Sequence, residues 1–168
     1  MPRIERPRME AYGVPADLDG ALPWSWAEDR LVANRNYWVV TVDAAGRPHS
    51  MPVWGVWDRS TERFWFSCDP GSLKARNLEV NPNVVVTTDD TIEVVSIEGS
   101  AQRHDGATSL CAAIAEAYAA KYENDPEPQA ELAAFVLAGA MFEVTPTKGF
   151  GVIERAEEFG PRATRWRW

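Results

Sequence analysis

The segment Ser67–Asn77 combines residue types that could bind an anion. An apolar run ends at Ser67, a Pro-Gly turn follows, and a short helix is predicted to begin after Ser72. The unpaired N–H groups of a helix N-terminus favour phosphate, and both serines offer hydroxyl donors. Lys74 adds a point charge and Arg76 a fork of donors. The pattern predicts a phosphate-binding segment, although a surface helix with solvated basic side chains, capped by Ser72, fits the periodicity equally well.

The two histidines have different surroundings. His49 lies on a predicted strand and could act as a general acid, because imidazole titrates near neutral pH. A hydrogen-bonded histidine at the end of a strand is an equally good explanation. His104 precedes Asp105-Gly106, a turn signature, and is expected to be exposed.

Two other kinds of site are disfavoured. The carboxylates show no paired-acid spacing on a common element, which argues against a glycosidase. Cys68 and Cys111 lie far apart, form no C-x-x-C pair and have no histidine cluster nearby, so no metal site is predicted. Both are expected to be reduced thiols, with Cys111 in the core.

The composition indicates one acidic globular domain. At 168 residues, with 45% apolar and 25% charged residues, the chain can bury a single core. Its formal net charge of -8 argues against a nucleic-acid partner, because contacts to phosphate backbones need a basic surface. No apolar run approaches the roughly 20 residues of a membrane span, and Met1–Met9 lacks the apolar centre of a secretory signal. We therefore expect a cytoplasmic location and no membrane partner.

Strand-like patterns dominate the chain after residue 36. The first three strands, Tyr37–Val42, Pro48–Trp57 and Arg63–Ser67, are separated by tight turns and predict an antiparallel meander. Further strands are predicted over Val84–Thr88, Ile92–Ala101, Ala140–Val144, Gly149–Glu154 and Ala163–Trp168, and helices over 25–35, where Ser25 would open a capping box, 72–80, 108–122 and 129–139.

These elements predict a mainly β fold with helices (α+β). Short antiparallel strands favour a Greek-key or related barrel, since closure removes exposed edges. Parallel nucleotide-binding folds are disfavoured because no G-x-G-x-x-G follows a strand. Residues 1–20, which are rich in proline and charge, are expected to form an N-terminal arm or a surface wrap, and residues 21–168 a single domain.

Several stretches together resemble the pyridoxamine 5′-phosphate oxidase-like superfamily of split β-barrels, including its flavin- and deazaflavin-dependent branch. No single motif is decisive, but their order and spacing are specific in combination. The similar stretches are Gly46-Arg47-Pro48-His49-Ser50-Met51-Pro52-Val53-Trp54, Ser72-Leu73-Lys74-Ala75-Arg76-Asn77-Leu78 with Asn81-Pro82, Val94-Val95-Ser96-Ile97-Glu98-Gly99, and Thr164-Arg165-Trp166.

The resemblance implies an FMN-binding-like split barrel over residues 21–168, a small-molecule substrate, and a cofactor bound at a homodimer interface. The cofactor ring would lie against strand 49–54 and its phosphate against the run 72–77. His49 is the catalytic candidate. The implied cofactor-binding residues are His49, Ser50, Met51, Pro52, Val53, Trp54, Ser67, Ser72, Leu73, Lys74, Arg76, Asn77, Arg165 and Trp166. Along an ideal strand His49, Met51 and Val53 share one face, and Ser50, Pro52 and Trp54 share the other.

Two departures from the family pattern bear on the cofactor. Where the family's oxidases place an arginine and a lysine to hold the FMN phosphate, this chain has Met51 and Val56. Each charge-assisted hydrogen bond lost in this way is worth about 1.5–3 kcal/mol. The resemblance therefore implies an oxidoreductase that transfers hydride to a small organic substrate, with F420 slightly preferred over FMN. A non-catalytic carrier of flavin, F420 or a tetrapyrrole, and a dimeric structural or regulatory barrel with an empty site, are the alternatives.

Overall fold

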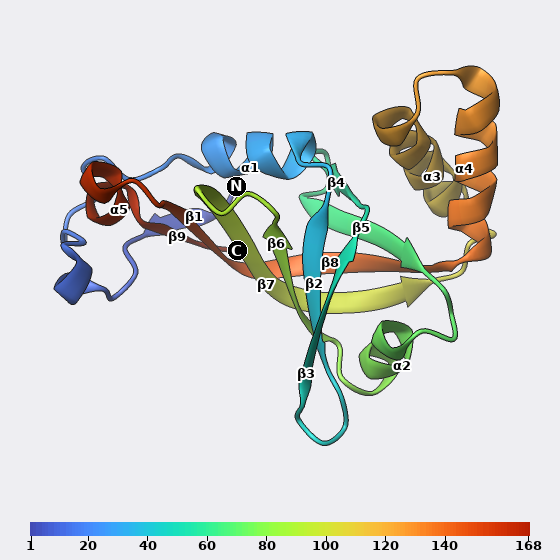
Figure 1. The fold of residues 1–168 in the computed structure, drawn as a ribbon, viewed down its shortest axis with the longest axis horizontal. Coiled ribbons are helices and arrows are strands. Elements are labelled where there is room, and N and C mark those ends of the chain that lie inside the picture. The colour runs from blue at the N-terminus through green and yellow to red at the C-terminus, as the bar shows by residue number, and fades with distance from the viewer.

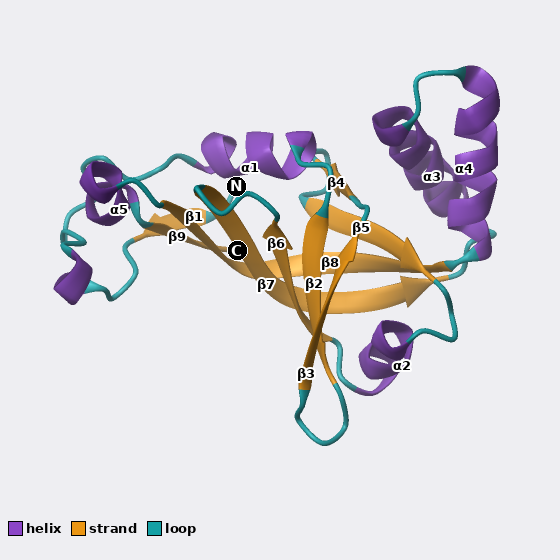
Figure 2. Ribbon diagram, viewed as in Figure 1, coloured by secondary structure: helices purple, strands orange, loops and turns teal.

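The computed structural model describes residues 1–168 and shows a mixed α+β fold, in which one antiparallel sheet of nine strands carries five helices (Figure 1, Figure 2). The strands are β1 (Arg3–Glu5), β2 (Tyr37–Val42), β3 (Pro48–Val53), β4 (Val56–Asp58), β5 (Arg63–Cys68), β6 (Asn83–Thr88), β7 (Glu93–His104), β8 (Ala140–Ile153) and β9 (Thr164–Arg167). The helices are α1 (Trp24–Ala33), α2 (Leu73–Val80), α3 (Ser109–Tyr122), α4 (Pro126–Ala138) and α5 (Ala156–Arg162). None of the helices combines the length and the apolar character needed to cross a bilayer.

The sheet forms a split barrel, which confirms the predicted antiparallel α+β fold class. Its strands follow the order β1-β9-β8-β7-β6-β2-β3, while β4 pairs with β5 and β5 pairs with β8. Strand β3 pairs only with β2, so its second edge is free. The free edge leaves the backbone of β3 open to a partner or a ligand.

The predicted three-strand meander is wrong. The sequence predicts one strand over Pro48–Trp57, but the chain breaks at Gly55 into β3, which pairs with β2, and β4, which pairs with β5. A Cβ on Gly55 would lie 2.7 Å from Phe64 Cε2 and 2.8 Å from the carbonyl oxygen of Trp65. The chain therefore needs glycine where it changes partner strands, a constraint that the alternation of apolar residues does not encode.

The two predicted closing strands, Ala140–Val144 and Gly149–Glu154, are one strand. Strand β8 runs through Pro146 without interruption and pairs with β5, β7 and β9 along its length. Proline lacks an N–H group, but Pro146 stands opposite Gly99, next to an irregularity of register at which Thr147 of β8 has no partner on β7. Because the ladder is interrupted there in any case, the proline does not end the strand.

The helix boundaries agree with the sequence at α2 and differ at α1 and α4. The Ser72 hydroxyl caps α2 as predicted, accepting a hydrogen bond from the backbone N–H of Ala75 at 3.3 Å. Helix α1 begins at Trp24, so Ser25 lies inside its first turn and does not open a capping box. Helix α4 begins at Pro126, three residues before the predicted start, because proline suits the first turn of a helix.

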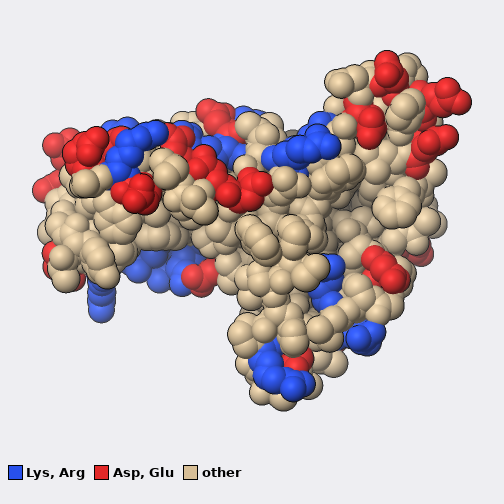
Figure 3. Space-filling view, in the orientation of Figure 1, with Lys and Arg blue, Asp and Glu red and all other residues tan.

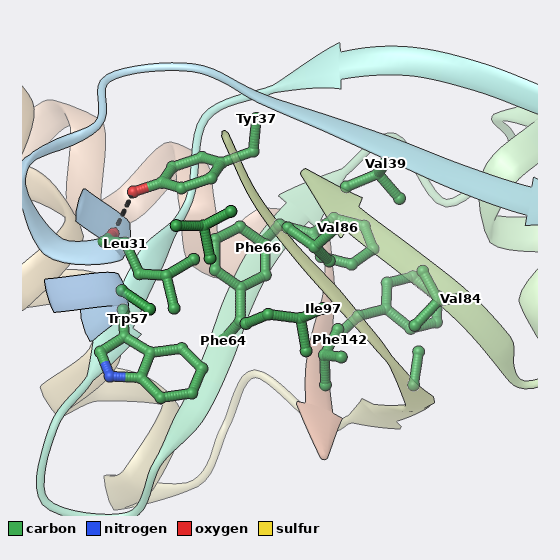
Figure 4. Close-up of a cluster of buried hydrophobic side chains, with 14 of the residues drawn as sticks. Leu31, Tyr37, Val39, Trp57, Phe64, Phe66, Val84, Val86, Ile97 and Phe142 are labelled. Carbon is green, nitrogen blue, oxygen red and sulfur yellow. Dashed lines mark hydrogen bonds between the residues drawn. The ribbon is translucent and has the colours of Figure 1, made fainter. Parts of the chain in front are cut away.

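Besides a small cluster of Val14, Val152 and Ala163, two apolar cores hold the fold. The larger one fills the barrel, where Tyr37, Phe64 and Phe66 are almost completely buried (Figure 4). The smaller one lies between the α3–α4 hairpin and the outer side of β4, β5 and β8, and includes Trp65 and Cys111. Cys111 is fully buried, as predicted, and both cysteines are free thiols. The hairpin therefore projects from the barrel as a lobe with its own packing (Figure 1).

The guanidinium of Arg6 links the N-terminal residues to the C-terminal segment that includes Pro161 and Ala163. Strand β1 pairs with β9, and Arg6 follows it directly. Its side chain donates hydrogen bonds to the carbonyl oxygens of Pro161 and Ala163, both at 2.8 Å, of Asp17 at 2.7 Å, and of Asp19. One side chain therefore satisfies four backbone acceptors from two distant segments.

Replacing Arg6 with alanine is expected to lower the free energy of unfolding by about 2 kcal/mol, because several charge-assisted hydrogen bonds are lost together. Urea denaturation followed by tryptophan fluorescence measures this change. Arg8→Ala, on a nearby exposed side chain, is the matched control and should change stability by less than about 0.5 kcal/mol. Equal free energies of unfolding of the two variants would contradict a stabilising role for the Arg6 hydrogen bonds.

Candidate functional site

A cavity of about 540 Å³ lies where β2, β3 and α2 meet. This volume falls within the range of roughly 300–1,000 Å³ typical of small-molecule sites. Five of its lining residues belong to the cofactor-binding set implied by the sequence. The full lining is Val39, Thr41, Pro48, His49, Ser50, Met51, Leu73 and Lys74.

The register of β2 and β3 decides which side chains face the cavity. His49 stands opposite Thr41, and Met51 stands opposite Val39. Thr41 and Val39 are buried on the inner side of the sheet, and directly opposed residues of antiparallel strands point to the same face. The predicted alternation is confirmed within β3, with His49, Met51 and Val53 on the inner side and Ser50 and Pro52 on the outer side, whereas Trp54 follows the end of the strand.

Lys74 is the only lysine or arginine that lines the cavity, and it is half-buried in the first turn of α2. Nearby carboxylates are engaged elsewhere. Asp69 accepts a backbone N–H of its own turn at 2.8 Å, and Glu79 pairs with Arg103 at 3.1 Å. The first amides of α2 have no acceptor within the helix. The N-terminal end of α2 therefore presents positive charge beside the cavity, and the Lys74 ammonium has no carboxylate partner.

Three other residues of the segment Ser67–Asn77 do not line the cavity. The Ser67 hydroxyl donates to the carbonyl oxygen of Val136 at 2.9 Å, on the side of α4. Arg76 is exposed and its guanidinium donates to a carbonyl oxygen of the preceding turn. Asn77 is buried behind the cavity wall and donates from Nδ2 to the hydroxyl of Thr41, a lining residue, at 3.0 Å, which links α2 to the sheet.

Three residues implied by the resemblance lie further away. Trp54 stacks on Tyr122 of α3, with ring centroids 4.5 Å apart and planes 9° apart. Trp166 is fully buried in the barrel core, and Arg165 Nε donates to Glu5 Oε2 at 2.9 Å. Strands β9 and β3 lie towards opposite edges of the sheet (Figure 1). Within one protomer, Arg165 and Trp166 therefore do not join the cavity.

The two positions where the family's oxidases carry cations are not equivalent in this fold. Met51 lines the cavity and is 55% exposed. Val56 is buried in the smaller core with Trp65 and faces a different part of the molecule. Lys74 is consequently the single side-chain cation available to an anionic ligand in the cavity.

The expectation that His104 is exposed is wrong. Its side chain is 19% exposed and its ring lies 4.9 Å from the ring of Trp65. His104 Nε2 is 2.7 Å from Glu143 Oε2, and Glu143 also pairs with Arg63 at 3.2 Å. The residue sits on the long strand β7 before the turn, where cross-strand neighbours cover it.

The turn between β2 and β3 holds a carboxylate at the edge of the cavity. Asp43 accepts hydrogen bonds from the backbone N–H groups of Arg47 and Ala45, each at 2.9 Å, and from Arg47 Nε at 2.8 Å. These bonds, with that of the Arg47 amide the strongest influence, lower the pKa of Asp43 to about 2. His49 Nε2 lies 3.5 Å from Asp43 Oδ2, so this turn also orients the imidazole.

The lowered pKa of Asp43 predicts a contribution to acid stability. Its folded-state pKa lies below the ordinary value, so the stabilisation is complete above about pH 4 and is lost as the pH falls towards 2. We expect the free energy of unfolding to decrease less steeply between pH 4 and pH 2 in Asp43→Asn than in the wild type. Urea unfolding at a series of pH values measures both slopes, and identical slopes would contradict this role.

A row of uncharged residues crosses the outer side of the sheet. Trp38 on β2 is 44% exposed and stands between Pro52 of β3 and Thr87 of β6. Ser96 of β7 continues the row. An exposed tryptophan on a flat, uncharged surface is typical of a protein interface.

Three residues of the cavity are not among those that the sequence implied. Val39, Thr41 and Pro48 line it together with the implied residues. The sequence does indicate that Val39 and Thr41 share one face of a strand, because they alternate with Trp38 and Val40. What was missing is the pairing of β2 with β3 in register, which places Thr41 beside His49.

Comparison with known proteins gives one family match. The family model described as pyridoxamine 5′-phosphate oxidase matches residues 27–148, more than half of the chain and every residue that lines the cavity. No curated protein matches the sequence.

Three solved structures share the fold. Conserved hypothetical protein Rv2991 from Mycobacterium tuberculosis aligns with a TM-score of 0.70 at 17% identity, over 84% of this chain and 91% of its own. The heme storage protein HutZ from Vibrio cholerae aligns at 0.57 and 19% identity, over 73% and 86%. A structure named as an F420 reductase aligns at 0.51 and 20% identity, over 73% and 94%. At these identities the likeness concerns the fold alone.

Proposed function

Because the chain belongs to the pyridoxamine 5′-phosphate oxidase family, we propose that it is an oxidoreductase that binds F420 or FMN and transfers hydride to a small organic substrate. One observation carries this proposal. The half-buried Lys74, which has no carboxylate partner, lines a cavity of about 540 Å³ beside the free-edged strand β3.

The residues of the cavity fit a cofactor with a phosphate and an aromatic ring. The Lys74 ammonium and the first amides of α2 suit a phosphate, because charge-assisted hydrogen bonds are the strong ones. Met51, Val39 and Leu73 supply an apolar flank for a ring. A few polar groups set in a mostly apolar wall are typical of cofactor sites.

Each residue would have a definite task in the proposed reaction. Reduced F420 or FMN supplies a hydride when bound. Lys74 would hold the phosphate and so fix the position of the ring along β3. His49 would deliver the matching proton to the reduced substrate from Nδ1, because Nε2 faces Asp43, and Asp43 would hold the orientation of the imidazole at the cavity.

The deazaflavin F420 is preferred to FMN. With methionine at position 51 and a buried valine at position 56, Lys74 stands alone as the side-chain cation at the cavity. An FMN phosphate held by one lysine lacks two of the contacts expected in the family's oxidases. The structure named as an F420 reductase shares this fold, which supports the same preference.

We further propose a homodimer with the cofactor between the protomers. The exposed Trp38 in its uncharged row, and the free edge of β3, offer a surface next to the cavity for a second copy. Arg165, which lies far from the cavity of its own chain, would then be available near the partner's site, whereas Trp166, fully buried in the barrel core, would act only by positioning β9. We place the protein in the cytoplasm, where its two free thiols would stay reduced.

Parallel titration of the purified protein with F420 and FMN tests the proposal, with quenching of cofactor fluorescence as the readout. We expect both cofactors to bind, F420 at least as tightly as FMN. Turnover is then followed as the oxidation of stoichiometric reduced cofactor by small unsaturated substrates. Lack of binding of either cofactor at micromolar concentration would contradict the proposal and favour a structural barrel.

A carrier of a tetrapyrrole is the second candidate. It is favoured by the imidazole of His49 on the cavity, since histidine is a common axial ligand of heme iron. The heme storage protein HutZ has the same fold. Under this alternative, added heme would give a Soret shift that His49→Ala removes and His104→Ala keeps, and the protein would show no turnover with reduced cofactor.

A further inference from the structure

A second hollow lies between α3 and the barrel and shares no residue with the cavity at α2. Its volume is about 710 Å³, and its walls come from the end of α1, from β4 with the following turn, and from α3. Figure 3 shows the recess where the α3–α4 lobe meets the body of the molecule. We call it the α3 groove.

Helix α3 is apolar on two sides, and only one side is packed. Cys111 and Tyr118 are buried in the smaller core. Leu110, Ala113 and Ala117 line the α3 groove and are exposed. Exposed apolar side chains that line a hollow leave apolar surface uncovered, so the open face has room for an apolar occupant.

Lys121 stands at the C-terminal end of this open face. Its ammonium donates to the Tyr37 hydroxyl at 2.6 Å and to the carbonyl oxygen of Gly55 at 3.0 Å. It also lies 4.7 Å from the ring centre of Tyr37 and 5.4 Å from that of Tyr122. All of these partners are neutral, since burial raises the pKa of both tyrosines.

Burial lowers the pKa of Lys121 to about 8, and no carboxylate opposes this effect. At neutral pH the side chain is therefore a half-buried cation without a counter-ion. The other charged residues of the groove are engaged. Arg59 pairs with Glu28 at 2.8 Å, and Asp58 accepts hydrogen bonds from neighbouring hydroxyls and amides.

Asp58 is also separated from the lysine end of the groove. Lys121 contacts Gly55, just before β4, whereas Asp58 ends that strand. Three residues of extended chain span about 10 Å. The two ends of the groove therefore differ in charge. Lys121, a cation without a counter-ion, lies at one end, and Asp58 and Arg59, which already have partners, lie at the other. The wall between them, along α3 and β4, is apolar.

We propose that the α3 groove binds an apolar organic anion, a carboxylate with an aliphatic or aromatic body, whose head group pairs with Lys121. The charge of the carboxylate complements the one unpaired cation. Its apolar body covers Leu110, Ala113 and Ala117, the face of α3 that the chain leaves open. This site is independent of cofactor binding at α2, because the two cavities share no residue.

Two variants of the protein distinguish the contact with the ligand's head group from the apolar contacts of the groove. Lys121→Met removes the charge and keeps most of the side-chain volume. It leaves Tyr37 and Gly55 with other partners, because the Tyr37 hydroxyl still donates to the carbonyl of Asn34 and the Gly55 carbonyl still accepts from Tyr122. Ala117→Phe fills the groove from an exposed position and disturbs neither core.

Calorimetric titration with decanoate, and with decanol as a neutral ligand of the same chain length, tests the proposal. Decanoate should bind the wild type at least tenfold more tightly than decanol. Lys121→Met should abolish that difference, and Ala117→Phe should weaken both ligands at least tenfold. Lys148→Met, at a lysine paired with Glu98 on another part of the sheet, should change neither affinity.

The pH dependence gives an independent readout. Decanoate affinity should fall as the pH rises from 7 to 9.5 in the wild type and stay constant in Lys121→Met, since the Lys121 ammonium is the one group lining the groove that titrates in this range. Absence of decanoate binding, equal affinity for decanol, or binding that survives Ala117→Phe would overturn the proposal. If the wild type did not bind decanoate and Ala117→Phe changed the oligomeric state, the groove would be an interface between copies, and the proposal would likewise be overturned.

Discussion

Lys74→Ala is expected to weaken the binding of F420 or FMN at least tenfold. Lys74 is half-buried at the cavity, where its ammonium has no carboxylate partner within the chain. Removing it takes away the only side-chain cation that the cavity offers to a phosphate. A tenfold loss corresponds to about 1.4 kcal/mol, less than the usual value of one charge-assisted hydrogen bond. Fluorescence titration of wild type and variant with both cofactors measures the ratio.

Lys148→Ala is the matched control for this substitution. It removes the same charge from a lysine that pairs with Glu98 at 2.6 Å and lies outside the cavity. Its cofactor affinity should stay within about twofold of the wild type, which separates a local contact from a change in net charge. Unchanged binding of both cofactors in Lys74→Ala would mean that the phosphate lies elsewhere.

The fold class, the N-cap of α2 and the alternation of β3 were predictable because they depend on residues close together in the chain. Ser72 caps α2 through an amide three residues ahead, and the alternation of β3 sets His49 and Met51 on one face. Both follow from the geometry of a helix start and of a strand. The family resemblance then supplied the reason to expect a cofactor beside them.

The grouping of side chains within the segment Ser67–Asn77 was less predictable. Successive helical residues turn by about 100°, so Lys74 and Arg76 face different directions although they are two residues apart. Ser67 belongs to β5, whose pairing with β8 turns it towards α4. Of the two basic residues in this segment, only Lys74 therefore lines the cavity.

Strand pairing over long distances was the part that the sequence could not specify. The break at Gly55, the pairing of β5 with β8, and the continuity of β8 through Pro146 all depend on residues far apart in the chain. Local periodicity describes which face a residue takes but not which strand lies next to it. The α3 groove has the same origin, because Lys121 meets Gly55 only in the folded chain.

The close approach of β7 and β8 at Gly99 predicts the largest loss of stability. A Cβ on Gly99 would lie 2.9 Å from the carbonyl carbon of Thr145 and 3.1 Å from Pro146 Cα. Both atoms belong to the backbone of the paired strand, so no side-chain rotation can relieve the overlap. Gly99→Ala is therefore expected to lower the free energy of unfolding by about 3 kcal/mol, at the upper end of the usual cost of overpacking.

Gly71→Ala is the control that isolates this backbone overlap from the general effect of replacing glycine. A Cβ at Gly71 would meet only the side-chain carboxylate of Asp69, with Oδ1 nearest at the ordinary contact distance of 3.4 Å. The added methyl group should change stability by less than about 1 kcal/mol, since it mainly restricts the unfolded chain. Urea unfolding of the three proteins compares the two substitutions directly. If Gly99→Ala were as stable as Gly71→Ala, β7 and β8 could separate at the bulge without loss, and Gly99 would not be needed for the closure of the barrel.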